Sequence, residues 1–172
     1  MVKALFPGTF DPIHFGHIDI AERAARLFDE VILAVYDKPL KTLLFSPEER
    51  MTLVKQAFKT NPKISVTGYS GLTVDFCRRV GAAVIVRGLR VFSDFELEFR
   101  MALANHRLAQ DVEIVAFITN EEHTFLSSTT VREIAMLDGD VSSMVPPHVE
   151  KALKEKAKGF DGNSSLPDSL RD

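Results

Sequence analysis

Short apolar runs alternate along this chain with longer segments of helical periodicity, and this alternation restricts the fold more than any other feature. The runs at residues 31–36 (VILAVY) and 83–87 (AVIVR) are apolar at consecutive positions. A strand with one face in water would instead alternate apolar and polar side chains. The sequence therefore predicts an α/β fold, a Rossmann-like doubly wound five-stranded parallel sheet with helices on both faces.

The periodicity also predicts where the elements lie. Strands are expected at residues 2–6, 31–36, 64–69, 83–86 and 113–118. Helices are expected at residues 18–28, 46–58, 73–80, 94–109, 128–137 and 146–158. The run Ser46-Pro47-Glu48-Glu49 predicts a capping box at the start of one helix. Gly81 and Gly139 stand where a left-handed residue is expected to end a helix.

Composition limits the class of protein. With 172 residues, 45% of them hydrophobic, we expect one domain over residues 1–158, followed by a disordered tail at 159–172 that is rich in turn formers. The chain lacks an apolar run of the roughly 20 residues that span a membrane, as well as a secretory signal pattern, so we expect a cytoplasmic protein without membrane contact. A net charge of -3 disfavours nucleic acid as a partner. The single cysteine, Cys77, has apolar neighbours typical of a core thiol.

Unusual polar clusters follow three of the predicted strands. The first, residues 8–17 (GTFDPIHFGH), holds Thr9 and His17 between a strand and a helix. The second places Arg87 and Arg90 after the fourth strand, and the third is the hydroxyl run 127–130 (SSTT). Open α/β sheets bind ligands beyond the carboxyl ends of their strands, where the strand order reverses. Because turn N–H groups, hydroxyls, helix N-termini and guanidinium forks all favour phosphate, we expect a phosphate pocket.

Purely structural roles remain open for each cluster taken alone. A tight turn, N-capping hydroxyls and surface salt bridges would explain them one by one. Lys41, in the loop after the second strand, is either a phosphate partner or a solvated lysine. His14 and His17 are three residues apart, but without an HExxH pattern or a third ligand nearby, protein-bound zinc is disfavoured. The sequence has no GxxxxGK[ST], GxGxxG or GxSxG motif, which disfavours ATPases, dehydrogenases and hydrolases of those types.

Taken together, these residues resemble the nucleotidyltransferase superfamily whose signature, HxGH after the first strand, is present here as HFGH at residues 14–17. Within that superfamily the chain is most similar to the bacterial phosphopantetheine adenylyltransferases. The resemblance covers about residues 2–157 and includes, in this order, PGTFDP, FSPEER, VRGLRVFSDFELE and FLSSTTVRE.

The resemblance implies an activity. Members of the family transfer AMP from ATP to 4'-phosphopantetheine, which gives dephospho-coenzyme A and pyrophosphate in the penultimate step of coenzyme A biosynthesis. We expect a direct in-line attack, with Mg²⁺ bound through the ATP phosphates. The resemblance also implies a homo-hexamer and inhibition by coenzyme A.

Site residues carry over position by position. The catalytic positions are His17, Thr9, Lys41 and Arg90. The ATP-binding positions are Thr9, Phe10, His17, Gly88, Leu89, Arg90, Glu98, His123, Thr124, Phe125, Leu126, Ser127, Ser128 and Thr129. The positions for the acceptor substrate are Thr9, Lys41, Thr73, Arg87 and Asn105.

Two positions depart from the family pattern: His123 replaces a common tryptophan or tyrosine, and Leu97 a common tyrosine. The nearest rival function is a nicotinamide or nicotinate mononucleotide adenylyltransferase, which shares the HxGH and SSTxxR elements but not RGLRVFSDFELE. A non-catalytic nucleotide-binding regulator with the same fold is the rival of another class.

Overall fold

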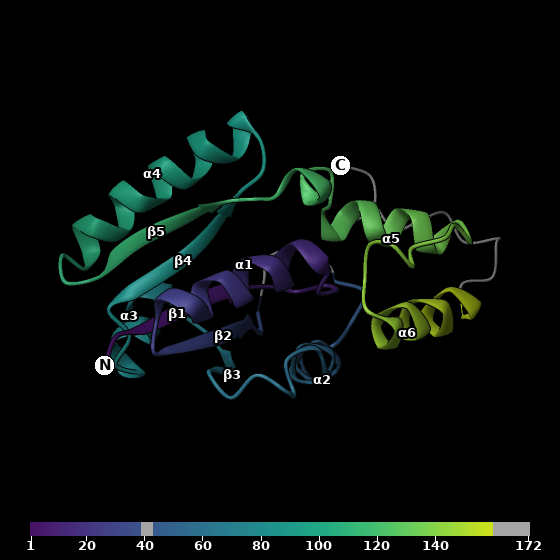
Figure 1. Ribbon diagram of the computed structural model, residues 1–172, viewed down its shortest axis with the longest axis horizontal. Coiled ribbons are helices and arrows are strands. Elements are labelled where there is room, and N and C mark those ends of the chain that lie inside the picture. The colour runs from purple at the N-terminus through teal and green to yellow at the C-terminus, as the bar shows by residue number, and fades with distance from the viewer. Residues whose placement is uncertain (39–42, 160–172) are drawn as a thin grey trace.

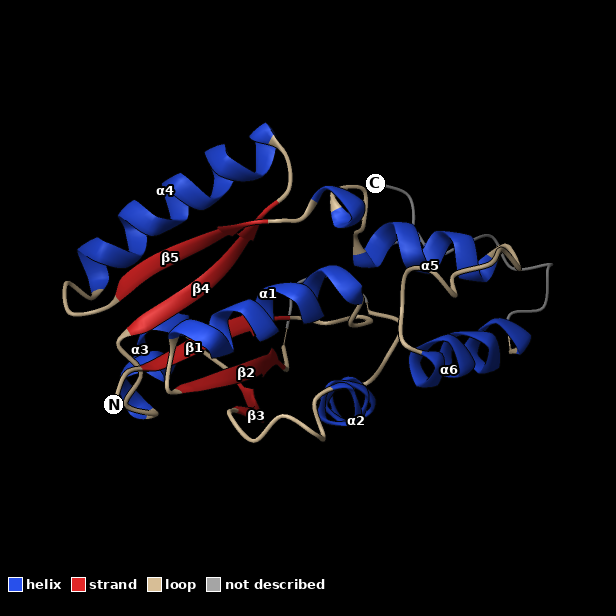
Figure 2. Cartoon of the chain, in the orientation of Figure 1, coloured by secondary structure: helices blue, strands red, loops and turns tan. Residues whose placement is uncertain are grey.

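The computed structural model describes residues 1–38 and 43–159, and within them it contains a five-stranded, all-parallel sheet (Figures 1 and 2). The strands are β1 (Lys3–Gly8), β2 (Glu30–Tyr36), β3 (Ile64–Tyr69), β4 (Val84–Leu89) and β5 (Glu113–Ile118). The helices are α1 (Phe15–Leu27), α2 (Pro47–Ala57), α3 (Thr73–Arg79), α4 (Phe92–Leu108), the 3₁₀ turn η1 (Glu121–His123), α5 (Ser128–Met136) and α6 (Pro147–Lys158). The predicted fold class is therefore confirmed.

Alternate residues of each strand enter one of two apolar cores, as strand geometry requires. Ala4 and Phe6 of β1 join the core that contains residues of α1, α2, α5 and α6. Leu5, between them, joins the core built with α3 on the other face of the sheet. The double-sided burial explains why the strand sequences are apolar at consecutive positions.

The sheet order β3-β2-β1-β4-β5 places the reversal between β1 and β4. β1 and β2 pair over their whole length, from Lys3 with Glu30 to Gly8 with Val35. β1 and β4 pair only through Ala4 with Val84 and Leu5 with Ile85. Both strands continue for several residues beyond that pairing, so they separate toward their carboxyl ends and open the sheet at its switch point.

Helix ends test the capping predictions. Ser46 caps α2 as predicted, because its Oγ accepts from the Glu49 N–H at 3.2 Å and Glu49 Oε2 accepts from the Ser46 N–H at 2.8 Å. Gly81 has the predicted left-handed φ of +70°. The prediction for Gly139 is wrong: Asp138, with φ +59°, is the left-handed residue. Gly139 meets a steric demand instead, since a Cβ there would lie 2.5 Å from Ile134 Cγ2 and 2.9 Å from the Ile134 carbonyl oxygen.

Two helices have features that affect the site. α1 begins at Phe15, so Gly16 and His17 lie in its first turn, whereas the sequence suggested a start near residue 18. α4 buries none of its residues and exposes several large apolar side chains, among them Phe92 at 84% and Leu97 at 62%. It lies along the β4–β5 edge of the sheet (Figure 1).

Across the described ranges, every helix is too short or too polar to cross a membrane. The predicted tail falls, except for Gly159, outside those ranges, and the domain boundary near residue 158 stays a prediction.

Candidate active site

A cavity of about 680 Å³ opens where β1 and β4 separate. Its walls come from the carboxyl end of β1, the first turn of α1, the end of β4, α4, and the start of α5. These segments are distant in sequence, and the strand order brings them to one rim of the sheet. The sequence-predicted clusters therefore face a single cavity.

His17 lies on the cavity wall as a neutral imidazole. Its Nδ1 accepts a hydrogen bond from the His14 backbone N–H at 3.3 Å, which leaves the ring proton on Nε2. Burial, with the positive charges of Arg90 and Arg87 nearby, lowers the pKa of His17 to about 3. The ring packs edge-on against Phe10, with the centroids 5.1 Å apart. His17 can thus donate a hydrogen bond from Nε2 at neutral pH without carrying a charge.

The two arginines of the second cluster both reach carboxylates of α4. Arg87 Nε donates to Glu98 Oε2 at 2.7 Å, and its Nη2 donates to the other oxygen of that carboxylate. Arg90 Nε donates to Asp94 Oδ2 at 2.9 Å, and its Nη1 donates to the Leu126 carbonyl at 2.8 Å. These contacts fix both guanidinium planes against the cavity, where their remaining N–H groups suit phosphate oxygens.

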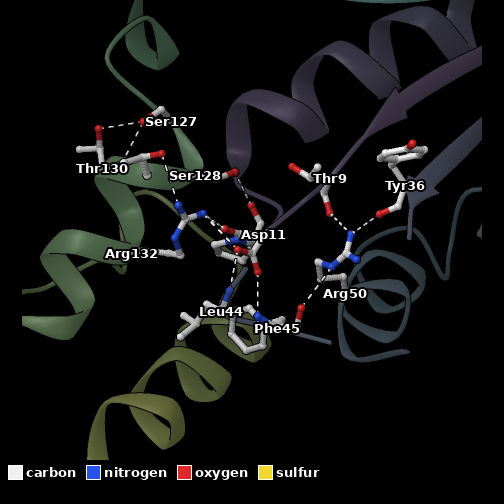
Figure 3. Close-up of polar contacts among 12 residues, drawn as sticks. Thr9, Asp11, Tyr36, Leu44, Phe45, Arg50, Ser127, Ser128, Thr130 and Arg132 are labelled. Carbon is white, nitrogen blue, oxygen red and sulfur yellow. Dashed lines mark hydrogen bonds and ion pairs between the residues drawn. The ribbon is translucent and has the colours of Figure 1, made fainter. Parts of the chain in front are cut away.

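The hydroxyl run begins helix α5 at the cavity. Ser127 caps the helix, because its Oγ accepts from the Thr130 N–H at 3.0 Å. Ser128 Oγ donates to the Pro12 carbonyl at 2.9 Å and so joins α5 to the turn after β1 (Figure 3). The first N–H groups of a helix lack intrahelical partners and favour an anion. This end of α5 is therefore suited to a phosphate group.

Gly88 is a point of close approach inside the site. A Cβ on Gly88 would lie 2.4 Å from Ile20 Cδ1, so a larger residue at this position would require the end of the Ile20 side chain to move. Gly88 and Ile20 line the cavity together with His17 of α1 and Arg87 of β4.

A second part of the cavity is more apolar and extends along α4. Leu97, Met101, Ala102 and Asn105 of α4 line it, together with Ile114 of β5. Tyr69, whose hydroxyl is 3.0 Å from Thr73 Oγ1, also lines the cavity. An elongated ligand with an apolar body and a few amide groups would match such a lining.

Most of the sequence-predicted site residues line the cavity. They are Thr9, Phe10, His17, Thr73, Arg87, Gly88, Arg90, Glu98, Asn105, His123, Ser127, Ser128 and Thr129. Four others, Leu89, Thr124, Phe125 and Leu126, are not part of the lining, although Leu126 contributes its carbonyl to Arg90. Lys41 lies outside the described residues.

Sequence reasoning missed a buried polar network beneath the turn after β1 (Figure 3). Asp11, fully buried, accepts from the Leu44 and Phe45 N–H groups, both at 2.9 Å, and pairs with Arg132 at 3.2 Å. Arg50 of α2 reaches the same turn from another side. The motifs PGTFDP, FSPEER and FLSSTTVRE contain Asp11, Arg50 and Arg132 respectively, but nothing in their spacing showed that these residues meet.

Comparisons with known proteins identify the relatives of this chain. A family model described as cytidylyltransferase-like matches residues 5–134. A phosphopantetheine adenylyltransferase of Roseiflexus sp. (strain RS-1) is 54% identical over 154 residues, which are 90% of this chain and 96% of that protein. One of Staphylococcus haemolyticus (strain JCSC1435) is 47% identical over 156 residues, covering 91% and 97%. A solved structure from Vibrio parahaemolyticus, assigned as a nicotinate-nucleotide adenylyltransferase, shares the fold with a TM-score of 0.70 at 20% identity, covering 91% of this chain and 94% of that one.

Proposed function

The chain belongs to the phosphopantetheine adenylyltransferase family, and we propose that it transfers AMP from ATP to 4'-phosphopantetheine, releasing dephospho-coenzyme A and pyrophosphate. The observation that carries the proposal is the single cavity, in which a neutral imidazole, two guanidinium groups and a hydroxyl-rich helix start face one another. An enzyme that joins two phosphorylated substrates needs such a concentration of donors, because the substrates repel each other.

In the proposed reaction, an oxygen of the acceptor phosphate attacks the α-phosphorus of ATP, and the bond from that phosphorus to the β-phosphate oxygen breaks. Pyrophosphate leaves in line, and no covalent enzyme intermediate is formed. Thr9 and His17 are assigned to the reacting phosphate, where the His17 Nε2–H meets the charge that develops on a non-bridging oxygen. Donors placed where charge develops are usually the largest contribution to such catalysis.

Arg87, together with Lys41, is assigned to the acceptor phosphate, and Arg90, Ser128 and Thr129 to the phosphates of ATP. The apolar part of the cavity along α4, with Thr73 and Asn105, is assigned to the pantetheine arm. Its largely apolar lining with a few polar groups supports that assignment. Coenzyme A combines the same arm with an adenylate group, which supports inhibition by coenzyme A through the same cavity.

We assign Mg²⁺ to the ATP phosphates. Across the described ranges, no group of three or more His, Cys, Asp or Glu side chains is arranged to hold a metal ion. Mg²⁺ commonly keeps several water ligands and is carried largely by substrate phosphates, where it would neutralise part of their charge. The cavity hydroxyls and guanidinium groups are compatible with a metal that enters with ATP.

We also propose that the protein is a homo-hexamer working in the cytoplasm, where ATP is supplied. The exposed apolar side chains of α4 support self-association, since apolar patches of this kind commonly mark interfaces. Sedimentation equilibrium of the purified chain tests the assembly, and a monomer at all concentrations would contradict it.

The deciding experiment is incubation with a nucleotide and an acceptor, followed by mass measurement of the product. ATP with 4'-phosphopantetheine should give dephospho-coenzyme A and pyrophosphate, whereas CTP, or nicotinate mononucleotide as acceptor, should give little product. A product only with nicotinate mononucleotide would favour the rival function. Nucleotide binding without pyrophosphate release would favour a non-catalytic regulator.

A further inference from the structure

Arg50 has an unusual setting for a charged side chain. It is 1% exposed, and it is the largest of the fully buried side chains. Its guanidinium donates to three carbonyl oxygens from separate segments: that of Thr9 at 2.7 Å, that of Tyr36 at 2.7 Å and that of Phe45 at 3.3 Å (Figure 3). One side chain of α2 therefore joins the turn after β1, the end of β2 and the segment that leads into α2.

No carboxylate lies within ion-pair distance of Arg50 among the residues that the structure describes. A buried charge without a paired counter-ion is costly unless hydrogen bonds satisfy it. A neutral side chain would fill the same space at lower cost. The carboxylates of Asp11 and Asp37 favour the charge of Arg50 from a longer distance, while the three carbonyls are the groups that its N–H donors contact directly.

The Thr9 carbonyl belongs to the peptide that precedes a strained residue. Phe10 has φ +48°, in the left-handed region that residues with a side chain rarely adopt. Such a conformation persists only where the surroundings fix it. Arg50 fixes the Thr9–Phe10 peptide directly, while the Phe10 ring is buried against Phe6 and His17.

The opposite end of that peptide is a free donor. The C=O and N–H of a trans peptide point in opposite directions, so the Thr9 carbonyl aimed at Arg50 turns the Phe10 N–H away from it. Within residues 1–38 and 43–159, the Phe10 N–H donates to no protein acceptor. Thr9 and Phe10 both line the cavity.

We propose that Arg50 is a positioning residue for the phosphate site: it holds the Thr9 carbonyl so that the Phe10 N–H faces the cavity as a donor to a phosphate of ATP. This inference rests on the proposed function for the identity of the anion. Arg50 itself lies behind the turn and does not contact the substrate.

Labelling can isolate the Phe10 amide. The sequence has two Thr–Phe peptides, Thr9–Phe10 and Thr124–Phe125, so ¹³C-carbonyl threonine with ¹⁵N-phenylalanine selects only the amides of Phe10 and Phe125. A Thr124→Val variant removes threonine from the second peptide and assigns both signals. ATP is added without acceptor, so no product forms during the titration.

In the wild type, the Phe10 amide proton should move downfield as ATP saturates the site. In Arg50→Lys, which cannot hold three carbonyls in one plane, that shift should be lost and the Kd for ATP by calorimetry should rise about tenfold to a hundredfold. The matched control is Leu153→Ala, a fully buried change in α6 that lowers stability but lies outside the cavity lining. It should keep both the shift and the affinity of the wild type.

Two outcomes would overturn the inference: a Phe10 signal in the wild type that does not respond to ATP, or an Arg50→Lys protein that behaves like the control. The first needs no variant, so it decides the matter even if Arg50→Lys fails to fold. Product formation by the wild type is measured separately. ATP binding through Phe10 without product would contradict the proposed function and leave the role of Arg50 standing.

Discussion

The imidazole rings of His14 and His17 are stacked, with centroids 3.7 Å apart and an angle of 28° between the rings. Burial, with the adjacent His17 ring and the positive charge of Arg90, holds the pKa of His14 well below its ordinary value, as burial and the two arginines do for His17. Two imidazolium ions at this separation would repel each other in a site that already contains guanidinium charge. The pair is therefore neutral at physiological pH, and the proposed role of His17 is that of a neutral hydrogen-bond donor.

Replacing His17 tests this role. His17→Ala should lower kcat by about 100-fold or more, because a donor aimed at the transition-state oxygen is lost, while the Kd for ATP changes little. Single-turnover kinetics and calorimetry measure the two quantities. His148→Ala, at a histidine that contacts the Leu53 carbonyl away from the cavity, is the control and should keep kcat. Near-normal turnover in His17→Ala would remove His17 from the mechanism.

Stability should depend on pH through the same two histidines. The unfolded chain binds protons on them near the ordinary pKa of 6.5, whereas burial lowers the pKa of His17 in the folded protein to about 3 and that of His14 in the same direction. The unfolded state thus takes up more protons as pH falls below 6.5. The free energy of unfolding should decrease there by up to about 1.4 kcal/mol per pH unit for each histidine.

Urea unfolding between about pH 7.5 and about pH 5 covers the upper part of this window, before most carboxylates titrate. His17→Gln should remove roughly half of the pH dependence. A free energy of unfolding that is constant over the range would show that the two rings are not held neutral.

Arg87 should affect the KM for the acceptor more than the KM for ATP. Arg87→Ala is expected to raise the KM for 4'-phosphopantetheine by about tenfold to a hundredfold, since it removes a bidentate partner for phosphate, with a smaller effect on the KM for ATP. Steady-state kinetics with each substrate varied in turn give both values. Arg78→Ala, which removes an exposed arginine paired with Asp111, controls for the loss of a positive charge. An unchanged acceptor KM would contradict the assignment.

At the end of α5, substitutions at two neighbouring positions should change the free energy of unfolding in opposite directions. Asp138→Gly should stabilise the fold by about 0.5 to 1 kcal/mol, because glycine adopts the left-handed conformation without steric cost. Gly139→Ala should destabilise it by about 1 to 3 kcal/mol, because the new methyl group meets the backbone of Ile134. Thermal unfolding measures both. Equal effects of the two changes would refute this account of the turn.

The sequence predicted the elements whose signals are local. The double-sided burial of β2 and β4 is visible in VILAVY and AVIVR, and the capping box at Ser46 and Glu49 lies within four residues. The clusters around His17, Arg87 and Ser128 could be found because each follows a strand, and parallel strands end at a common rim.

Other features depend on contacts that no local pattern encodes. Arg50 resembles an ordinary surface arginine of a polar helix, yet its partners include a carbonyl 41 residues away. The pairing of Arg132 with Asp11 spans 121 residues. Asp138 takes the left-handed conformation although a glycine follows it. The next position must itself be glycine, because a Cβ on residue 139 would clash with Ile134. Such choices are set by tertiary packing.

Helix α4 presents a carboxylate to each cavity arginine on one side, through Asp94 and Glu98, and exposes apolar residues on the other. Anything that covers the exposed side also limits how far the helix can tilt, and a tilt would move both guanidinium groups. If the proposed assembly covers that side, subunit concentration and substrate affinity are thermodynamically linked. A protomer in dilute solution would then bind its anionic substrates more weakly than one within the assembly.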